Sequence, residues 1–188
     1  MLGRAAALCA AVSLALPTAA CPAGGKYVFE GGTTAQRQVV VSALEASSFD
    51  WDVVPRPIVI HIVRAAASEA APGEIWLDGD LLDAGRFAWG VVQHEFAHQV
   101  DYLLLDDAQR ARLLRLLGGR DWCYGVPGLR HADYGCERFA STLAWSYWQS
   151  PDNCLRPTSP RDESAAMPAH QFKMLLDSMI TKDVRFQA

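Results

Sequence analysis

The segment from residue 84 to residue 105 constrains the fold most, because it is apolar on most sides of a helix and yet has titratable side chains at its centre. A helix that is hydrophobic all round is a buried one, so this segment predicts a helix in the middle of the domain. Its large apolar residues are Phe87, Trp89, Val91, Val92, Phe96, Val100 and Leu103. Two histidines and a glutamate buried among them are unfavourable unless their polar atoms share a partner.

The titratable residues of this segment follow the pattern H-E-x-x-H, as His94, Glu95 and His98. Histidines at positions i and i+4 of a helix lie on one face, with about 5 to 6 Å between their Cβ atoms, so both imidazoles can bind one metal ion. Glu95 is displaced around the helix by about 100° from His94 and about 60° from His98. It borders the metal, where a carboxylate can deprotonate a water whose pKa Zn²⁺ lowers to about 7. The pattern therefore predicts one Zn²⁺ ion bound by His94 and His98, with Glu95 as the general base.

A catalytic zinc site has three protein ligands and one open position, so a third ligand is required. We expect it to be Glu137, near the start of a helix predicted from about residue 133 to residue 149. The same face of that helix has small residues, Ala140, Ser141 and Ala144, which let it approach the H-E-x-x-H helix closely. The alternative for Glu137 is a structural role, as a first-turn carboxylate favoured by the helix dipole or as a salt-bridge partner.

Three further residues, Asp133, His131 and Asp101, are alternative third ligands. Asp101 follows His98 by about one helical turn, so its side chain lies near that imidazole. We therefore expect Asp101 to orient an imidazole or to hold the facing helix, as residues that contact metal ligands do. The choice among the four candidate ligands stays open on these residues alone.

Two stretches of the sequence resemble one family of enzymes. HEFAHQVDY at 94–102 and ERFA at 137–140 are similar to the catalytic core of zincin metallopeptidases with the gluzincin arrangement. The likeness is greatest to lethal-factor-type peptidases, which pair H-E-F-G-H-x-x-D with a later E-x-F-A helix. It extends over residues 74–148, less than half of the chain. The metzincin pattern is absent, since Asp101 and Leu104 stand where that pattern has glycine and histidine.

The resemblance implies a small α+β zincin-like domain, in which a short mixed sheet with an edge strand packs on the H-E-x-x-H helix and further helices follow. It implies that His94, His98 and Glu137 bind zinc and that Glu95 is the base. The segment EIWLD at 74–78 then corresponds to the edge strand, which pairs with an extended polypeptide substrate.

Peptide hydrolysis also needs a group that stabilises the oxyanion, a role for Tyr, His or Arg near the metal. Tyr134 lies one turn before Glu137 and is the first candidate, and His131 is the second. Packing or capping by the Tyr134 ring is the alternative. His61, in a predicted strand, and His170, on the last predicted helix, are expected to be structural histidines.

The remaining patterns predict one α+β domain over residues 21–188. Amphipathic helices are expected over 33–46, over 106–119 and around 172–180, and strands over 58–64 and 74–78. The Ala-rich stretch between the two strands ends at Pro72-Gly73 and is expected to be a loop.

The first twenty residues have the order of a secretory signal peptide. Arg4 comes first, an apolar run follows from residue 5 to residue 16, and small residues at 18–20 precede a cleavage point. The apolar run is shorter than the roughly 20 residues of a membrane span. We therefore expect a secreted, extracytoplasmic protein without stable membrane insertion. Lipid anchoring through Cys21 is the alternative.

Without Cys9 of the signal, the cysteines are Cys21, Cys123, Cys136 and Cys154. An oxidising compartment favours two disulfides, and a zinc-thiolate cluster is disfavoured because the sequence has no C-x-x-C pair. Cys136 and Cys154 flank opposite ends of one predicted helix and are separated by at least about 20 Å, too far for a bond. Two of the three possible connectivities remain, and we favour the one that pairs Cys123 with Cys136 and Cys21 with Cys154.

Composition limits the remaining functions. Hydrophobic residues make up 51% of the chain and charged residues 20%, which excludes global disorder, and the net charge of -4 disfavours binding to nucleic acid. We expect a secreted zinc metallopeptidase that cleaves a polypeptide. The alternatives are an inactive zinc-binding module that holds a partner peptide and an amide hydrolase that acts on cell-wall peptide.

Overall fold

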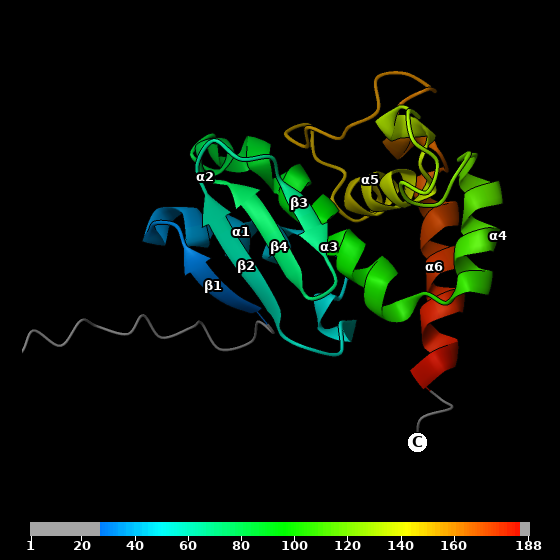
Figure 1. Ribbon diagram of the computed structural model, residues 1–188, viewed down its shortest axis with the longest axis horizontal. Coiled ribbons are helices and arrows are strands. Elements are labelled where there is room, and N and C mark those ends of the chain that lie inside the picture. The colour runs from blue at the N-terminus through cyan, green and yellow to red at the C-terminus, as the bar shows by residue number, and fades with distance from the viewer. Residues whose placement is uncertain (1–26, 185–188) are drawn as a thin grey trace, which may run out of the picture.

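The computed structural model describes residues 27–184, which form an α+β fold with a four-stranded mixed sheet and six α-helices (Figure 1). The strands are β1 (Tyr27–Gly31), β2 (Ile58–Val63), β3 (Glu69–Ala71) and β4 (Glu74–Asp78). The helices are α1 (Thr34–Ala46), α2 (Gly79–Leu82), α3 (Trp89–Leu104), α4 (Asp107–Leu117), α5 (Gly135–Tyr147) and α6 (Ala169–Val184). The sheet lies at one end, α4, α5 and α6 lie at the other, and α3 runs between them (Figure 1).

The sheet has the strand order β1-β2-β4-β3, with β3 antiparallel to β4 and the other neighbours parallel. The segment 74–78 is therefore an interior strand, and the prediction that it is the edge strand is wrong. The edge strand next to β4 is β3, which lies inside the Ala-rich stretch that was expected to be a loop. A tight turn at Pro72-Gly73, where Gly73 has a φ of 91°, reverses the chain and pairs β3 with β4 although alanine and glutamate have low strand propensity.

Capping residues set the boundaries of α1 and α4. Thr33 caps α1 and forms a capping box with Gln36, whose backbone N–H donates to the threonine Oγ1. Asp106 caps α4, which ends at Gly118 in the left-handed conformation with a φ of 72°. The central helix begins later than expected, at Trp89, because the residues before it form a 3₁₀ turn.

The prediction of a buried central helix is confirmed, because every residue of α3 from Val92 to Asp101 is buried. Alternate residues of β2, Ile58, Ile60 and Ile62, are buried as well. The apolar faces of α5 and α6 complete the core. β1 was not anticipated, because its apolar residues Tyr27, Val28 and Phe29 are consecutive and do not alternate with polar ones.

The predicted disulfide between Cys123 and Cys136 is confirmed, with 5.4 Å between the Cα atoms. Cys154 forms no disulfide with any residue in the described range. Its predicted partner Cys21 and the predicted signal peptide at 1–20 lie outside the described residues. Within residues 27–184, no helix has both the length and the apolar character required to cross a membrane.

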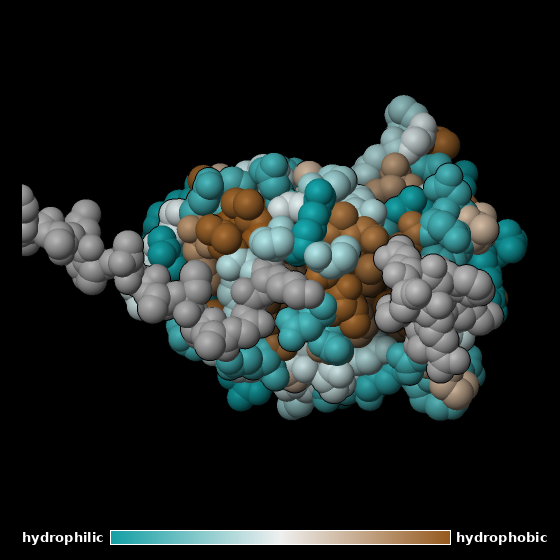
Figure 2. Space-filling view, turned by 90° about the horizontal axis from the view of Figure 1, so that it is seen from below, coloured by the Kyte–Doolittle hydropathy of each residue, from teal (hydrophilic) through white to brown (hydrophobic). Residues whose placement is uncertain are grey.

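Apolar side chains on the face in Figure 2 form patches that hydrophilic side chains surround and separate. The large exposed apolar residues come from different elements, and single exposed residues of this kind are normal on a protein surface. They are Val28, Val63, Phe87, Leu116, Tyr124, Val126 and Met174. Two of them, Tyr124 and Val126, belong to one loop, and that loop borders the site described next.

Candidate metal centre

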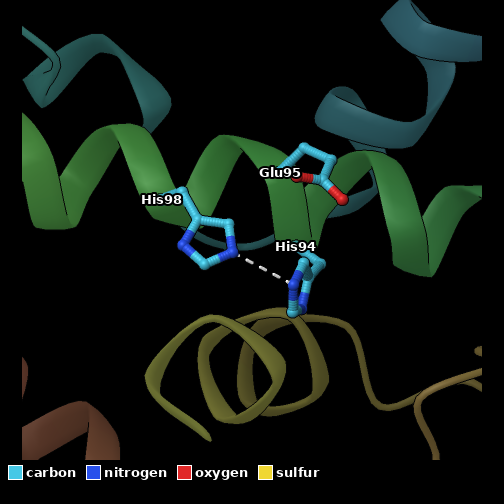
Figure 3. Close-up of side chains that lie close together, drawn as sticks. All are labelled: His94, Glu95 and His98. Carbon is cyan, nitrogen blue, oxygen red and sulfur yellow. Dashed lines mark hydrogen bonds between the residues drawn. The ribbon is translucent and has the colours of Figure 1, made fainter. Parts of the chain in front are cut away.

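The central helix α3 places His94 and His98 on the face that points toward α5 (Figure 3). Both side chains are buried, and their Nε2 atoms face each other at 3.2 Å. Ligand atoms of a tetrahedral zinc site are about 3.3 to 3.4 Å apart when each metal–nitrogen bond is about 2.0 to 2.1 Å. The two imidazoles are therefore spaced as two ligands of one ion.

The first turn of α5 brings the carboxylate of Glu137 to the same point. Its Oε2 atom is 3.1 Å from Nε2 of His94 and 3.4 Å from Nε2 of His98. Helices α3 and α5 can approach closely because the α5 side chains between them are small. Of these, Ala140 and Ala144 are completely buried. The residues thus fit a zinc ion, with two nitrogen donors and one oxygen donor separated by the distances that one tetrahedral ion requires.

Glu95 is displaced around α3 from the two imidazoles (Figure 3). Its carboxylate lies within 4.8 Å of ligand atoms of His94 and His98, and its side chain is buried. Burial raises the pKa of Glu95, and the charges of the two histidines oppose this rise. A carboxyl group with a raised pKa next to the metal position is suited to accept and return a proton.

The carboxylate of Glu137 is stabilised by three imidazoles. Burial alone would raise its pKa, but hydrogen bonds from His131, His94 and His98 hold the pKa well below its usual range. Burial likewise opposes protonation of His98, yet the hydrogen bond and charge of Glu137 raise the pKa of that histidine. In the metal-free protein His98 therefore retains a proton that a metal ion has to displace.

His131, in the 3₁₀ turn η3 (His131–Asp133), also reaches this cluster. Its Nε2 is 3.1 Å from Oε2 of Glu137, and its Nδ1 is 2.7 Å from Oε1 of Glu163 in the turn η4 (Glu163–Ala165). Hydrogen bonds with Glu137 and Glu163 raise the pKa of His131 to about 10. His131 is the alternative ligand that the structure brings to the site.

The other two alternative ligands have different partners. Asp133 binds the side chain of Arg130, with 2.8 Å between Arg130 Nη2 and Asp133 Oδ1. Asp101 accepts hydrogen bonds from Arg110 Nε at 2.8 Å and from Trp122 Nε1 at 3.2 Å. Asp101 therefore ties α3 to α4 and to the loop after α4.

Tyr134 does not reach the site with its hydroxyl group. It is buried, and its hydroxyl donates to the carbonyl oxygen of Val126 at 2.8 Å, which is the structural alternative expected for it. Tyr124 takes the place next to the third ligand, where its hydroxyl donates to Oε1 of Glu137 at 2.9 Å. The disulfide explains this position, because Tyr124 follows Cys123 and Glu137 follows Cys136.

A cavity of about 320 Å³ opens onto the cluster beneath the edge strand β3. Its lining residues are Ser68, Glu69, Ala70, His94, Glu95, His98, Tyr102, Tyr124, His131 and Glu137. Two side chains of α3 hold the hairpin of β3 and β4 over the site: Tyr102 donates to Ala70 O at 3.1 Å, and Gln99 Nε2 donates to Ala71 O at 2.9 Å.

A second cavity of about 360 Å³ shares Ser68, His94 and Glu95 with the first. Its wall includes three apolar residues, Leu81, Val91 and Leu155.

His61 and His170 lie away from the cluster, where the sequence had suggested structural roles. His61 is on the sheet, between Glu30 at 3.1 Å and Glu74 at 3.1 Å, and its ring stacks on Trp76. His170 is exposed on α6. Neither side chain lines the cavity beneath β3.

Comparisons of the chain with protein-family models, with curated proteins and with solved structures found no match. The interpretation of the site therefore depends on its own residues and geometry.

Proposed function

We propose that the protein is a secreted, zinc-dependent metallopeptidase of the zincin type. The observation that supports this most strongly is the convergence of Nε2 of His94, Nε2 of His98 and Oε2 of Glu137 within 3.1 to 3.4 Å of one another. The buried carboxyl of Glu95 lies beside them, at the bottom of a cavity that an edge strand covers.

In this proposal, His94, His98 and Glu137 hold the metal, and Glu95 moves the proton. Zinc, when bound, supplies Lewis-acid activation of the water and of the peptide carbonyl. Glu95 accepts a proton from the attacking water at its carboxylate and donates it to the leaving amine. Its raised pKa favours the first transfer, because a carboxylate with a higher pKa is a stronger base toward the water proton.

Tyr124 and His131 are the groups that could stabilise the oxyanion. Both side chains line the cavity beside Glu137 and are reachable from solvent. Tyr124 has a hydroxyl that can turn from Glu137 toward a substrate oxygen, and we assign it the role that the sequence suggested for Tyr134. The substrate backbone would lie along β3, as a further strand of the sheet.

The variant Glu95→Gln tests the proposal. It preserves the shape of the side chain and leaves all three metal ligands in place, so we expect bound zinc equal to that of the wild type. Loss of the general base should lower the rate of peptide hydrolysis by about 10² to 10⁴-fold. The assay is a fluorogenic peptide library that includes cell-wall peptides. Hydrolysis by Glu95→Gln at the wild-type rate would refute the role of Glu95.

A zinc-binding module without hydrolytic activity is the second candidate, and one observation favours it. His131 Nε2 is 3.1 Å from the same Oε2 atom that the other two imidazoles contact. Four protein ligands are typical of closed structural zinc sites, whereas catalytic sites keep one position open. This candidate predicts that the wild type binds zinc and cleaves no peptide in the library. It also predicts that His131→Ala, which opens one metal position, cleaves none of them.

A further inference from the structure

Gln99 joins the helix that carries two of the proposed metal ligands to the hairpin that borders the substrate cavity. It follows His98 directly on α3, and its side chain is completely buried. Its Oε1 atom accepts a hydrogen bond from the backbone N–H of Gly73 at 2.8 Å. Its Nε2 atom donates to the carbonyl oxygen of Ala71 at 2.9 Å and to that of Glu74 at 3.0 Å. One side-chain amide therefore binds backbone groups of β3, of β4 and of the turn between them.

The edge strand β3 needs such contacts, because its own residues do little to hold it. It has three residues, and its glutamate and alanines have low strand propensity. Within the described sheet its one neighbouring strand is β4, so the backbone groups along its other side have no strand to pair with. The hydroxyl of Tyr102 donates to one of these residues, at the carbonyl oxygen of Ala70. Side chains of α3 therefore support β3 where a second neighbouring strand is missing.

The geometry of α3 connects this support to the proposed metal centre. Successive residues of an α-helix are displaced around its axis by about 100°, so the side chains of His98 and Gln99 leave the helix in different directions. The imidazole of His98 points toward α5 (Figure 3), whereas the amide of Gln99 reaches the hairpin of β3 and β4. Side chains of one rigid helix thus set both the metal position and the position of the strand.

We propose that Gln99 is a positioning residue that fixes β3, and with it an extended polypeptide substrate, relative to the metal. This inference rests on the proposed function, in which the substrate backbone lies along β3. A substrate bound as an added strand places its scissile carbonyl only as accurately as the strand itself is placed. Because Gln99 is completely buried and acts through β3, its effect should increase with the length of substrate that β3 binds.

The variant Gln99→Met tests this role, because methionine has a similar length but neither of the N–H donors of the amide. The substrates are two library peptides that the wild type cleaves at the same bond, one of them longer on both sides of that bond. A displacement of about 1 Å can cost about 10²-fold in rate, and we expect a loss of about this size in kcat/KM for the longer peptide. The shorter peptide should lose less, so the ratio of the two kcat/KM values should fall. Partial unfolding would lower both values equally and would leave their ratio unchanged.

Gln93→Met is the matched control for Gln99→Met. Gln93 directly precedes His94, as Gln99 directly follows His98, and its side chain is also completely buried on α3. Its Nε2 atom donates to the carbonyl oxygen of Ala43 on α1, at 2.6 Å. We therefore expect Gln93→Met to keep the wild-type ratio of the two kcat/KM values. An equal fall of this ratio in both variants, or an unchanged ratio in Gln99→Met, would overturn the positioning role.

Tyr102→Phe gives a second test, which does not depend on the folding of Gln99→Met. It removes one hydroxyl group, so the hydrogen bond to Ala70 is lost while the ring can keep its place beside the imidazole of His98. The ratio of the two kcat/KM values should fall here too, by a smaller factor than in Gln99→Met. An unchanged ratio in Tyr102→Phe would contradict the role of α3 in placing β3.

Amide hydrogen exchange in the full chain separates this inference from the proposed function. The N–H of Gly73 donates to Gln99, so it should exchange about tenfold faster in Gln99→Met than in the wild type or in Gln93→Met. If this difference is found but the wild type cleaves no peptide, the proposed function fails and Gln99 still holds the hairpin. If the wild type cleaves peptides and Gly73 exchanges at one rate in all three proteins, the positioning role fails alone.

Discussion

Removal of the disulfide between Cys123 and Cys136 should lower the free energy of unfolding by about 3 kcal/mol. The two cysteines are 13 residues apart in sequence, and their bond restricts the unfolded chain by closing this loop. A loop of that length corresponds to about 3 kcal/mol at 25 °C in the chain-entropy model. The variant is Cys123→Ala/Cys136→Ala, and the buried position of Cys136 means that loss of packing adds to the entropic effect.

Urea unfolding of the wild type and of this double variant, both with zinc chelated, measures the difference. Chelation is required because bound metal would itself stabilise the folded state. With a urea m-value of about 2 kcal/mol/M, the loss of about 3 kcal/mol moves the midpoint down by about 1.5 M. An equal midpoint for both proteins would refute the account, because the loop that brings Tyr124 to Glu137 would then be held without the disulfide.

Three further predictions concern the site and its support. Tyr124→Phe should lower the rate of hydrolysis by about 10²-fold with zinc content unchanged, whereas Tyr134→Phe should leave the rate near that of the wild type, as steady-state kinetics would show. The raised pKa of His131, about 10, stabilises the metal-free protein fully below about pH 6.5, and this stability is lost as the pH rises through about 10. Between about pH 6.5 and pH 10, the urea midpoint of the metal-free wild type should therefore fall more than that of His131→Gln. Parallel plots of midpoint against pH for the two proteins would contradict this prediction. Gly90→Ala should lower the free energy of unfolding by about 1 to 3 kcal/mol, because an added Cβ would lie 2.4 Å from Oδ1 of the buried Asn153. Thermal unfolding measures this loss, and an unchanged melting temperature would show that Asn153 moves freely.

Local patterns predicted five of the six α-helices in the described residues and three side chains of the candidate metal centre, those of His94, His98 and Glu137. The i, i+4 spacing of His94 and His98 is a property of one helix, so the sequence was enough to place both imidazoles on one face. Glu137 was predictable because small residues on α5 indicate a close approach of two helices. The distance that a helix imposes between its two ends excluded a bond between Cys136 and Cys154, which left the pair Cys123–Cys136 as one of two possibilities.

Contacts between distant segments were harder to predict. The edge strand β3 forms because the turn at Pro72-Gly73 folds it back onto β4, which no property of its own residues indicates. Tyr124 and Glu163 come from loops, and their positions depend on the disulfide and on η4. The disulfide prediction contained the signal for Tyr124, since a bond between Cys123 and Cys136 brings the residue after each cysteine close together.

Metal analysis of the purified protein measures whether His94, His98 and Glu137 bind a zinc ion. The three proteins are the wild type, His98→Ala and Glu137→Ala, each loaded with excess zinc and then dialysed. The account predicts one zinc ion per chain of the wild type and a large loss of bound zinc in both variants. Zinc content in Glu137→Ala equal to that of the wild type would contradict the assignment of Glu137, and a wild type without zinc would contradict the metal centre itself.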